Sequence, residues 1–294
     1  MLDTHNAVAN SGTFALGHRT VHRMGYGAMQ LAGPHVFGPP EDREGAIAVL
    51  REAVTLSIDH IDTSDFYGPH QTNRIIREAL APYPNDLTLV TKLGARRDDQ
   101  GAWLPAMEPQ ELIDAVESNC DNLGIERIEI ANLRLMFGDG DAGPTPGDVR
   151  PLLEPLIALK ERGRIGALGI SNALPEQIEA ARSMTNIVCV QNMYNLAHRG
   201  DDDLIDHLAT EGIAYVPFFP LGGFDRLQSD TLESVAQDLG ATPMQVALAW
   251  LLQRSPNILL IPGTSSVDHL RQNVAAANLR LPTDAVTTLD QIGG

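Results

Sequence analysis

The stretch VRPLLEPLIALKERGRIGALGISNALPEQIEAARSMTNIVCVQ, residues 149–191, gives the clearest indication of the fold. Residues 149–162 and 175–183 carry apolar side chains at helical spacing. Residues 165–171 and 187–191 are short, nearly continuous apolar runs, as expected for strands buried on both faces. Helix and strand therefore alternate across short turns, which is typical of βα units that build a parallel sheet.

The same alternation continues in both directions through nearly the whole chain. Eight segments are predicted to be strands: residues 23–29, 58–62, 87–92, 128–134, 165–171, 187–191, 213–218 and 258–262. Helices are predicted between and after them, at residues 43–56, 71–81, 109–123, 149–162, 175–183, 202–211, 231–239, 243–253 and 267–277. A length of 294 residues would also allow two domains. Eight βα units without a Ser/Gly linker between them favour one closed (β/α)8 barrel of the α/β class.

The two ends of the chain are interpreted separately. We expect residues 1–12 to be a flexible N-terminus and residues 13–294 to form a single (β/α)8 domain. Residues 12–24 contain two short alternating runs around Gly17 and His18, which predict a β-hairpin. This hairpin would cover the bottom of the barrel.

Composition limits the partners that the chain can have. Lys and Arg number 21 and Asp and Glu number 38, so the net charge is −17. Such an excess of carboxylates repels nucleic acid and anionic membranes, and we expect neither as a partner. The chain has no signal-like start and no apolar run of spanning length, and Cys120 and Cys189 lie in apolar segments. We expect reduced thiols and a cytoplasmic location, and the sequence predicts no particular oligomeric state.

Four reactive side chains lie at or just beyond the predicted ends of strands, where the loops of a parallel barrel converge. They are Asp62, Tyr67, Lys92 and Arg134. A phenol has a pKa of about 10, and a neighbouring ammonium such as that of Lys92 would lower it. Asp62 would keep that ammonium charged, and Arg134 would donate to a carbonyl oxygen. Together the four predict a site that delivers a proton to a small carbonyl substrate.

Each of these residues also has an ordinary explanation. A lone lysine at a strand end is usually an ion-pair partner, and a tyrosine in a loop usually packs. His70 is close to Tyr67 in sequence and is the next candidate for proton donation, although a solvated loop histidine is the simpler interpretation. It is the occurrence of four such residues at successive strand ends that favours a catalytic site.

Six short motifs in order carry a resemblance to a known family. They are IDTSDFYG at 61–68, TKLG at 91–94, GISN at 169–172, QNMYN at 191–195, FPLG at 219–222 and IPGTSSVDHLRQN at 261–273. This combination resembles the aldo-keto reductase superfamily over roughly residues 23–281. The resemblance implies an oxidoreductase barrel that reduces a small aldehyde or ketone with NADP(H), with Tyr67 as proton donor and Asp62 and Lys92 as its modulators.

One residue departs from the family pattern. Arg134 stands where the superfamily usually has a histidine, and a guanidinium cannot titrate as an imidazole does. With this variant, residues 132–134 and 216–224 resemble the bacterial pyridoxal reductase branch. The resemblance implies reduction of pyridoxal to pyridoxine. On chemical grounds we expect the aromatic ring of pyridoxal to lie against Phe218 or Phe224. The alternatives are a broad-specificity aldehyde reductase, a cofactor-binding regulatory subunit with little turnover and, with least support, a non-redox lyase or isomerase.

The cofactor-binding residues are predicted partly from side-chain chemistry and partly from the family resemblance. Ser171, Asn172 and Gln191 offer hydroxyl and amide groups for a nicotinamide carboxamide, and the helix beginning near Ser266 offers free N–H groups for a phosphate. NADP(H) is expected over NAD(H), with Arg271 replacing the lysine that many members carry at position 263. No residues have the spacing of a metal site. The predicted cofactor-binding residues are Gly27, Ala28, Met29, Asp62, Ser171, Asn172, Gln191, Phe218, Pro220, Leu221, Gly222, Ile261, Gly263, Thr264, Ser265, His269, Gln272 and Asn273.

Overall fold

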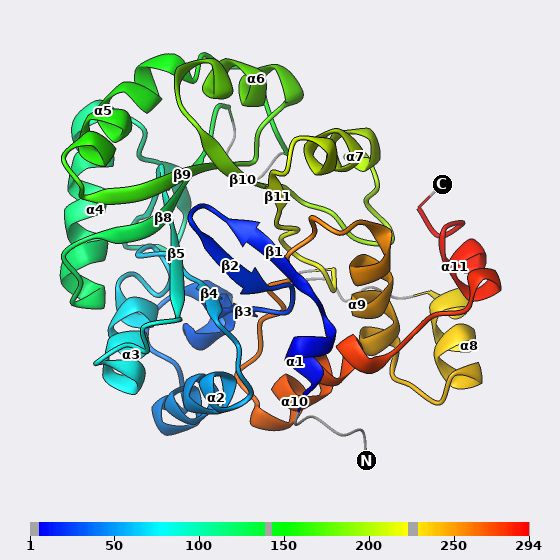
Figure 1. Ribbon diagram of the computed structural model, residues 1–294. Helices are drawn as coiled ribbons and strands as arrows, with labels where there is room; N and C mark the ends of the chain where they lie inside the picture. Colours follow the sequence, from blue (N-terminus) through cyan, green and yellow to red (C-terminus); the bar gives the residue numbers. More distant parts are fainter. Residues whose placement is uncertain (1–5, 139–142, 223–228, 294) are drawn as a thin grey trace.

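Seven parallel strands form a sheet that curls around a central axis in the computed structural model, which describes residues 6–138, 143–222 and 229–293. Figure 1 looks along this axis. The order in the sheet is β11–β10–β9–β8–β5–β4–β3. The strands are β3 (Tyr26–Gly27), β4 (His60–Asp62), β5 (Thr88–Leu93), β8 (Ile128–Arg134), β9 (Ile165–Ser171), β10 (Ile187–Gln191) and β11 (Ala214–Tyr215).

The eighth predicted strand closes the ring through isolated bridges. Ile258 pairs with Tyr215 of β11, and Leu260 pairs with Met24, just before β3. The Leu259 N–H donates to the Tyr215 carbonyl at 2.9 Å, and the Leu260 N–H donates to the Arg23 carbonyl at 2.7 Å. Pro262 has no N–H to extend this pairing. The predicted (β/α)8 barrel is thereby confirmed, with its last strand reduced to bridges.

Helices surround the sheet, as Figure 1 shows. They are α2 (Arg43–Thr55), α3 (Gln71–Leu80), α4 (Pro109–Leu123), α5 (Arg150–Glu161), α6 (Pro175–Met184), α7 (Asp202–Thr210), α8 (Asp230–Asp238), α9 (Pro243–Arg254) and α10 (Val267–Ala275), with short 3-10 turns η1 (Ala28–Leu31), η2 (Pro34–Val36) and η3 (Ala276–Asn278). The sequence predicts most of these bounds within a residue or two. Helix α9 begins with a side-chain cap, in which the Thr242 hydroxyl accepts from the Gln245 N–H at 3.2 Å.

The predicted hairpin covers the bottom of the barrel. Strands β1 (Thr13–Leu16) and β2 (Arg19–His22) pair antiparallel across one end of it. Leu16 and Val21 are buried in one cluster with the barrel-interior side chains Val90, Ile130 and Ala167. The hairpin therefore seals the end opposite the strand termini that carry the candidate site.

The structure departs from the sequence prediction at the N-terminus. Residues 7–10, expected to be flexible, form the short helix α1 (Ala7–Asn10), whose Ala7 and Val8 are buried in the main core. The reason is that this turn packs against the helices at the end of the chain, where the Asn10 amide donates to the Asn278 side chain at 2.7 Å.

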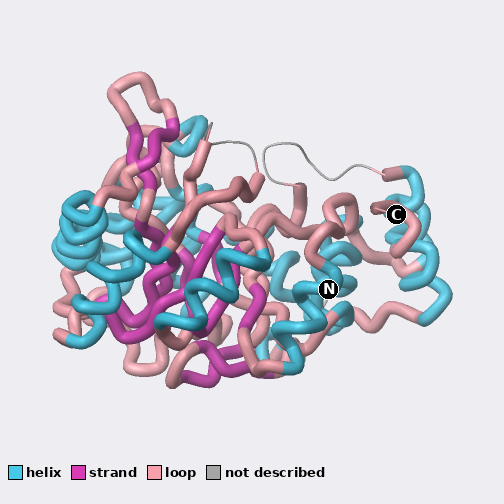
Figure 2. Tube along the Cα trace, turned by 90° about the horizontal axis from the view of Figure 1, so that it is seen from above, coloured by secondary structure: helices cyan, strands magenta, loops and turns pink. Residues whose placement is uncertain are grey.

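Two further elements are not predicted. A second hairpin, β6 (Ala95–Arg97) and β7 (Trp103–Pro105), follows β5, and helix α11 (Thr283–Leu289) lies near the C-terminus. Figure 2 shows the β6–β7 hairpin standing out from the body of the molecule on the side opposite β1–β2. It therefore borders the candidate site.

Candidate active site

An ion pair between neighbouring strands forms the base of the site. Asp62 ends β4 and Lys92 lies near the end of β5, and both side chains are almost completely buried. The Lys92 ammonium donates to the Asp62 carboxylate and to the Thr63 carbonyl at 3.2 Å. The second carboxylate oxygen accepts from the Gln191 amide at 2.9 Å. Burial lowers the pKa of Lys92, but the charge of Asp62 and the interaction with Tyr67 raise it by more, so the ammonium stays charged.

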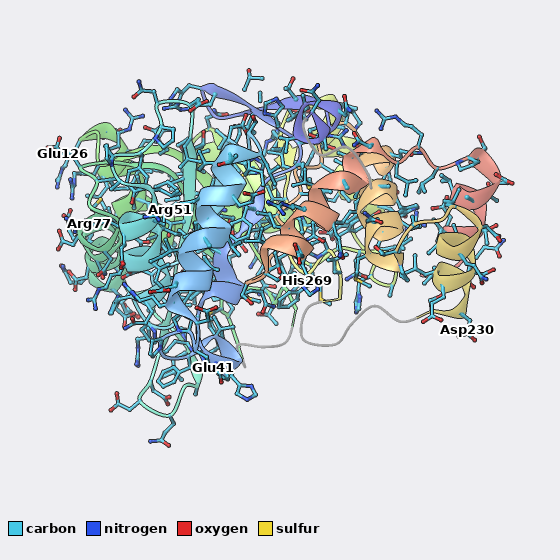
Figure 3. The ribbon with its side chains drawn as sticks, turned by 90° about the horizontal axis from the view of Figure 1, so that it is seen from below. Glu41, Arg51, Arg77, Glu126, Asp230 and His269 are labelled. Atoms are coloured by element: carbon cyan, nitrogen blue, oxygen red, sulfur yellow. The ribbon has the colours of Figure 1, made fainter. Side chains whose placement is uncertain are left out.

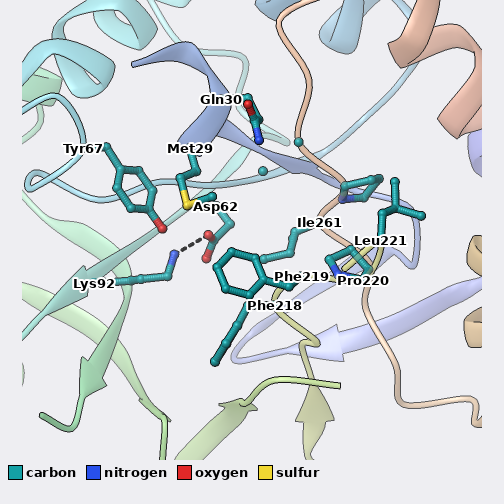
Figure 4. A pocket seen from close by; sticks show the side chains of 13 residues that line it. Met29, Gln30, Asp62, Tyr67, Lys92, Phe218, Phe219, Pro220, Leu221 and Ile261 are labelled. Carbon is teal, nitrogen blue, oxygen red and sulfur yellow. Dashed lines mark hydrogen bonds and ion pairs between the residues drawn. The ribbon is translucent and has the colours of Figure 1, made fainter. Parts of the chain in front are cut away.

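Tyr67 lies in the loop between β4 and α3, directly beside this pair. Its N–H donates to the Ser64 carbonyl at 3.2 Å, which closes a turn, and the Lys92 ammonium is 5.3 Å from the centre of its ring. Figure 4 shows the hydroxyl of Tyr67 and the ammonium of Lys92 pointing toward one another.

The pKa of Tyr67 differs from the expectation that its neighbour would lower it. Burial raises the pKa, Lys92 lowers it, Asp62 raises it and Arg134 lowers it, and the net pKa is above the ordinary value for tyrosine. The effect expected of Lys92 is present but smaller than the desolvation of a phenol that is only 6% exposed. Tyr67 is therefore a neutral, protonated group at pH 7.

Two cavities meet at these side chains. The smaller, of about 110 Å³, is lined by Gly27, Met29, Gln30, Asp62, Tyr67, Lys92, Phe218, Phe219, Pro220, Leu221, Ile261, Pro262 and Gly263. The larger, of about 370 Å³, is lined by Met29, Phe66, Tyr67, Lys92, Trp103, Arg134, Met136, Gly143, Asn172, Gln191, Met193, Phe218 and Phe219. Tyr67, Lys92 and Phe218 belong to both linings, so reacting groups held in the two cavities would meet at the hydroxyl of Tyr67.

Arg134 lies in the larger cavity, at the end of β8. Its guanidinium is 5.4 Å from the centre of the Phe218 ring, within the range of a cation–π contact. The register places Arg134 opposite Ser171 of β9. A permanent positive charge and an aromatic face therefore stand together beside the proton donor.

The three predicted amide-binding residues differ in what they offer. The Ser171 hydroxyl and the Gln191 amide oxygen are buried without a hydrogen-bond partner. The Asn172 amide donates to the Leu135 carbonyl at 3.0 Å and so fastens the loop, with Asn172 in the left-handed region at φ 57°. A buried polar group without a hydrogen-bond partner destabilises the protein. A ligand amide that bonded to the Ser171 hydroxyl and the Gln191 oxygen would remove this cost, so the two groups are suited to bind one.

Close backbone contact explains the glycine at position 263. Gly27 and Gly263 form a bridge, and a Cβ at Gly263 would lie 2.8 Å from the Gly27 carbonyl oxygen. A Cβ at Gly27 would lie 2.4 Å from the Ile261 carbonyl oxygen. The lysine that many members of the resembled family carry at 263 would therefore collide with the backbone here.

The predicted phosphate site lies at the start of α10. Ser266 caps this helix by accepting from the His269 N–H at 3.4 Å, and the Thr264 hydroxyl accepts from the Ser266 N–H at 3.1 Å. His269 and Gln272 are exposed on the surface of α10, where Figure 3 labels His269. Arg271 does not point to an open site: its guanidinium binds Glu52 of α2 at 2.8 Å. Arg271 could replace the missing lysine as a phosphate ligand only if its ion pair with Glu52 opened.

Several side chains of the site were missed by the sequence analysis. Trp103, Phe66, Met136 and Met193 line the larger cavity, and Gln30, Phe219 and Pro262 line the smaller one. The sequence feature that indicates the hairpin carrying Trp103 is the turn just before it. In this turn the Asp98 carboxylate accepts from the Gln100 and Ala102 N–H groups, and Gly101 has φ 81°. Conversely, Ala28, Ser171, Gly222, Thr264, Ser265, His269, Gln272 and Asn273 line neither cavity in the described part of the chain. Phe224 lies outside the described residues.

His70 is directed away from the reacting centre. Its Nδ1 is 2.8 Å from the Asp65 carboxylate, which also accepts from the side chains of Asn73, Ser118 and Asn122. Hydrogen bonding to Asp65 raises the pKa of His70. The histidine thus belongs to a polar network that joins the Tyr67 loop to α3 and α4.

Comparison with known proteins agrees with this geometry. The family model described as "Aldo/keto reductase family" matches residues 23–293. The chain belongs to the aldo/keto reductase family. Among curated relatives, pyridoxine 4-dehydrogenase of Escherichia coli (strain K12) is 62% identical over 283 residues, which is 96% of this chain and 99% of that protein. An uncharacterized oxidoreductase of Schizosaccharomyces pombe is 35% identical, covering 97% of this chain and 91% of that protein.

Solved structures of aldo-keto reductases share the fold. A thermostable aldo-keto reductase in complex with epalrestat has a TM-score of 0.80 and 26% identity, covering 96% of this chain and 99% of that one. An aldo/keto reductase from Klebsiella pneumoniae in complex with NADP and acetate has a TM-score of 0.78 at 22% identity, covering 95% and 94%. The expected enzyme class, an oxidoreductase of this family, is confirmed.

Proposed function

We propose that this aldo/keto reductase reduces pyridoxal to pyridoxine with NADPH, and oxidises pyridoxine in the reverse direction at the same site. The observation that carries the proposal is the 62% identity, across nearly the whole of both chains, to a pyridoxine 4-dehydrogenase. The site supports it independently, since a buried phenol, an ammonium and a guanidinium surround a cavity with aromatic walls.

The smaller cavity and the residues beside it are suited to NADP(H). Phe218, which lines both cavities, supplies a ring for the nicotinamide to stack on. Gln191, which lines the larger cavity, and Ser171, its register partner on β9, have unpaired buried polar atoms for the carboxamide. Gly27 and Gly263 line the smaller cavity with backbone atoms alone, and the N-terminus of α10 with Thr264 and Ser265 is suited to a phosphate. When bound, NADPH supplies the hydride for the carbonyl carbon.

The proton for the carbonyl oxygen comes from Tyr67. Its hydroxyl is neutral at pH 7 and adjoins both cavities, so it can donate as the oxygen gains negative charge. Lys92 stabilises the phenolate left behind, because a buried positive charge lies beside the ring. Asp62, held by Gln191, keeps the ammonium charged and oriented.

The larger cavity is suited to pyridoxal in shape and charge. Trp103, Phe66 and Phe218 provide aromatic walls for a pyridine ring. The Arg134 guanidinium can hold the phenolic oxygen next to the aldehyde by a charge-assisted hydrogen bond. These two contacts leave the aldehyde near the hydroxyl of Tyr67.

The direct test is to follow NADPH oxidation with pyridoxal and to identify pyridoxine chromatographically, with NADH as the parallel arm. We expect stoichiometric pyridoxine and a higher kcat/KM with NADPH. Absence of pyridoxine, or turnover with NADH alone, would contradict the proposal.

The proposed setting is the cytoplasm. Cys120 and Cys189 are both buried and unbridged, as expected of thiols in a reducing compartment. In the described part of the chain, no helix is at once long enough and apolar enough to cross a bilayer.

A further inference from the structure

The β6–β7 hairpin brings a tryptophan to the larger cavity. Trp103 lies in β7, and its ring meets the Phe66 ring edge to face at 5.5 Å between centroids. Phe66 meets the Tyr67 ring in the same manner at 5.4 Å. Three aromatic rings joined by two edge-to-face contacts therefore lead from the hairpin to the proton donor.

Arg97 lies opposite Trp103 in the hairpin and covers one side of its ring. The two residues are register partners, and the guanidinium carbon is 4.0 Å from the indole centroid. The same guanidinium donates to the Gly101 carbonyl at the hairpin tip, at 2.6 and 3.0 Å. Arg97 thus binds both the ring and the turn of its own hairpin.

The guanidinium also binds a strained turn beside the hairpin. His35 and Val36 have φ of 57° and 58°, a region that is costly for a β-branched residue such as valine. Arg97 donates to the Val36 carbonyl at 2.8 Å and to the His35 carbonyl at 3.1 Å. Such a conformation persists only where surrounding contacts determine it.

The strained turn is itself joined to the catalytic loop. The Val36 carbonyl that binds Arg97 also accepts from the N–H of Gly68, the residue after Tyr67, at 3.1 Å. Arg97 therefore connects the hairpin, the 35–36 turn and the loop of the proton donor.

We propose that Arg97 is a positioning residue that sets specificity for aromatic aldehydes, by holding the Trp103 indole as a fixed wall of the substrate cavity. The inference rests on the proposed function, because it concerns the same cavity. A planar ring gains from a rigid aromatic wall, whereas a small aliphatic aldehyde makes little contact with it. Lysine could not replace this arginine fully, since only the planar fork stacks on the indole and donates in several directions together.

The test compares Arg97→Met with the matched control Arg96→Met. Arg96 is the neighbouring arginine on β6, with an exposed side chain whose ion pair with Glu111 spans 4.0 Å. For each protein, kcat and KM are measured with pyridoxal and with propanal. Trp103 emission is taken as the difference from the corresponding Trp103→Phe protein, and circular dichroism checks folding.

We expect Arg97→Met to raise KM for pyridoxal about tenfold, equivalent to about 1.4 kcal/mol. KM for propanal and both kcat values should change less than about twofold, and Trp103 emission should shift to the red as the indole is exposed. Arg96→Met should change none of these. In a Trp103→Ala background, Arg97→Met should have no further effect on KM for pyridoxal, because the wall is already absent.

An equal rise in KM for both aldehydes, or unchanged Trp103 emission in folded Arg97→Met, would overturn the inference. If Arg97→Met does not fold, Arg97→Lys is judged by the same two criteria. If the wild-type protein does not reduce pyridoxal, the proposed function fails, and benzaldehyde replaces pyridoxal in the same comparison. The emission measurement needs no turnover and tests the positioning of Trp103 in either case.

Discussion

At the scale of single residues, the site depends on how burial acts on each ionisable group. Burial raises the pKa of Tyr67 and keeps the phenol protonated. At Lys92 the interactions with Asp62 and Tyr67 together outweigh the effect of burial on the pKa and leave the ammonium charged. The outcome is a neutral acid beside a fixed positive charge. This arrangement stabilises negative charge where it develops during carbonyl reduction, with little rearrangement of the protein.

Replacing Tyr67 with phenylalanine should remove the acid and retain the packing. We expect kcat to fall about 10²-fold or more, the usual scale for a positioned general acid, with cofactor affinity unchanged. Lys92→Met should behave similarly. Steady-state kinetics together with NADPH titration by fluorescence separate the two effects, and near-native turnover of Tyr67→Phe would reassign proton donation.

The loss of kcat/KM on removing Arg134 should depend on whether the substrate carries a phenolic oxygen. We expect Arg134→Ala and Arg134→His to lose more kcat/KM with pyridoxal than with an aldehyde lacking a phenolic oxygen, by about 1.5–3 kcal/mol, the range for hydrogen bonds to charged groups. Neutral and phenol-bearing aromatic aldehydes provide the comparison. Equal losses on both would leave Arg134 as a general electrophile without a role in recognition.

At the scale of elements, the sequence predicts the bounds of the strands with long apolar runs, whereas it predicts the short strands as too long. Residues 23–29 and 213–218 were expected to be strands, and only Tyr26–Gly27 and Ala214–Tyr215 form β3 and β11. β8, β9 and β10 begin and end as expected because a buried parallel strand has a continuous apolar signature. Residues 258–262 close the barrel through bridges, which depend on partners distant in sequence. Trp103 was missed for a related reason, since the β6–β7 hairpin is too short for its alternation to stand out.

The glycine contact that helps to close the barrel gives a stability prediction. Gly263→Ala places a Cβ 2.8 Å from a backbone oxygen, so we expect a loss of about 1–3 kcal/mol, typical of overpacking. Gly200→Ala is the matched control, because a Cβ there meets nothing within 4 Å. Urea unfolding measures both. A Gly263→Ala protein as stable as the control would mean that the 27–263 contact is loose.

The contact between Asp65 and His70 gives a pH prediction. Asp65 raises the pKa of His70 in the folded protein above its unfolded value near 6.5. The stabilisation is therefore fully present below pH 6.5 and is lost as the pH rises through the raised pKa. The gap in Tm between wild type and His70→Gln should be larger at pH 5.5 than at pH 9, and small because the imidazole is 45% exposed. A gap independent of pH would exclude this contribution.

At the scale of the whole molecule, the barrel brings residues from distant parts of the chain to one face. Asp62, Lys92, Arg134 and Gln191 could be predicted because each ends or nearly ends a strand, and parallel strands end together. The cofactor residues on α10 followed from resemblance alone, and their roles stay predictions. Arg271 shows why, because its ion pair with Glu52 depends on the packing of α10 against α2.

The central claim is that this site is built for pyridoxal and does not simply accept aldehydes in general. The most direct measurement is kcat/KM with NADPH for pyridoxal and for 4-nitrobenzaldehyde under identical conditions. We predict that pyridoxal equals or exceeds 4-nitrobenzaldehyde, because Arg134 and the aromatic walls recognise its ring and phenolic oxygen. A tenfold advantage for 4-nitrobenzaldehyde, about 1.4 kcal/mol in transition-state binding, would contradict the claim and indicate a broad-specificity aldehyde reductase.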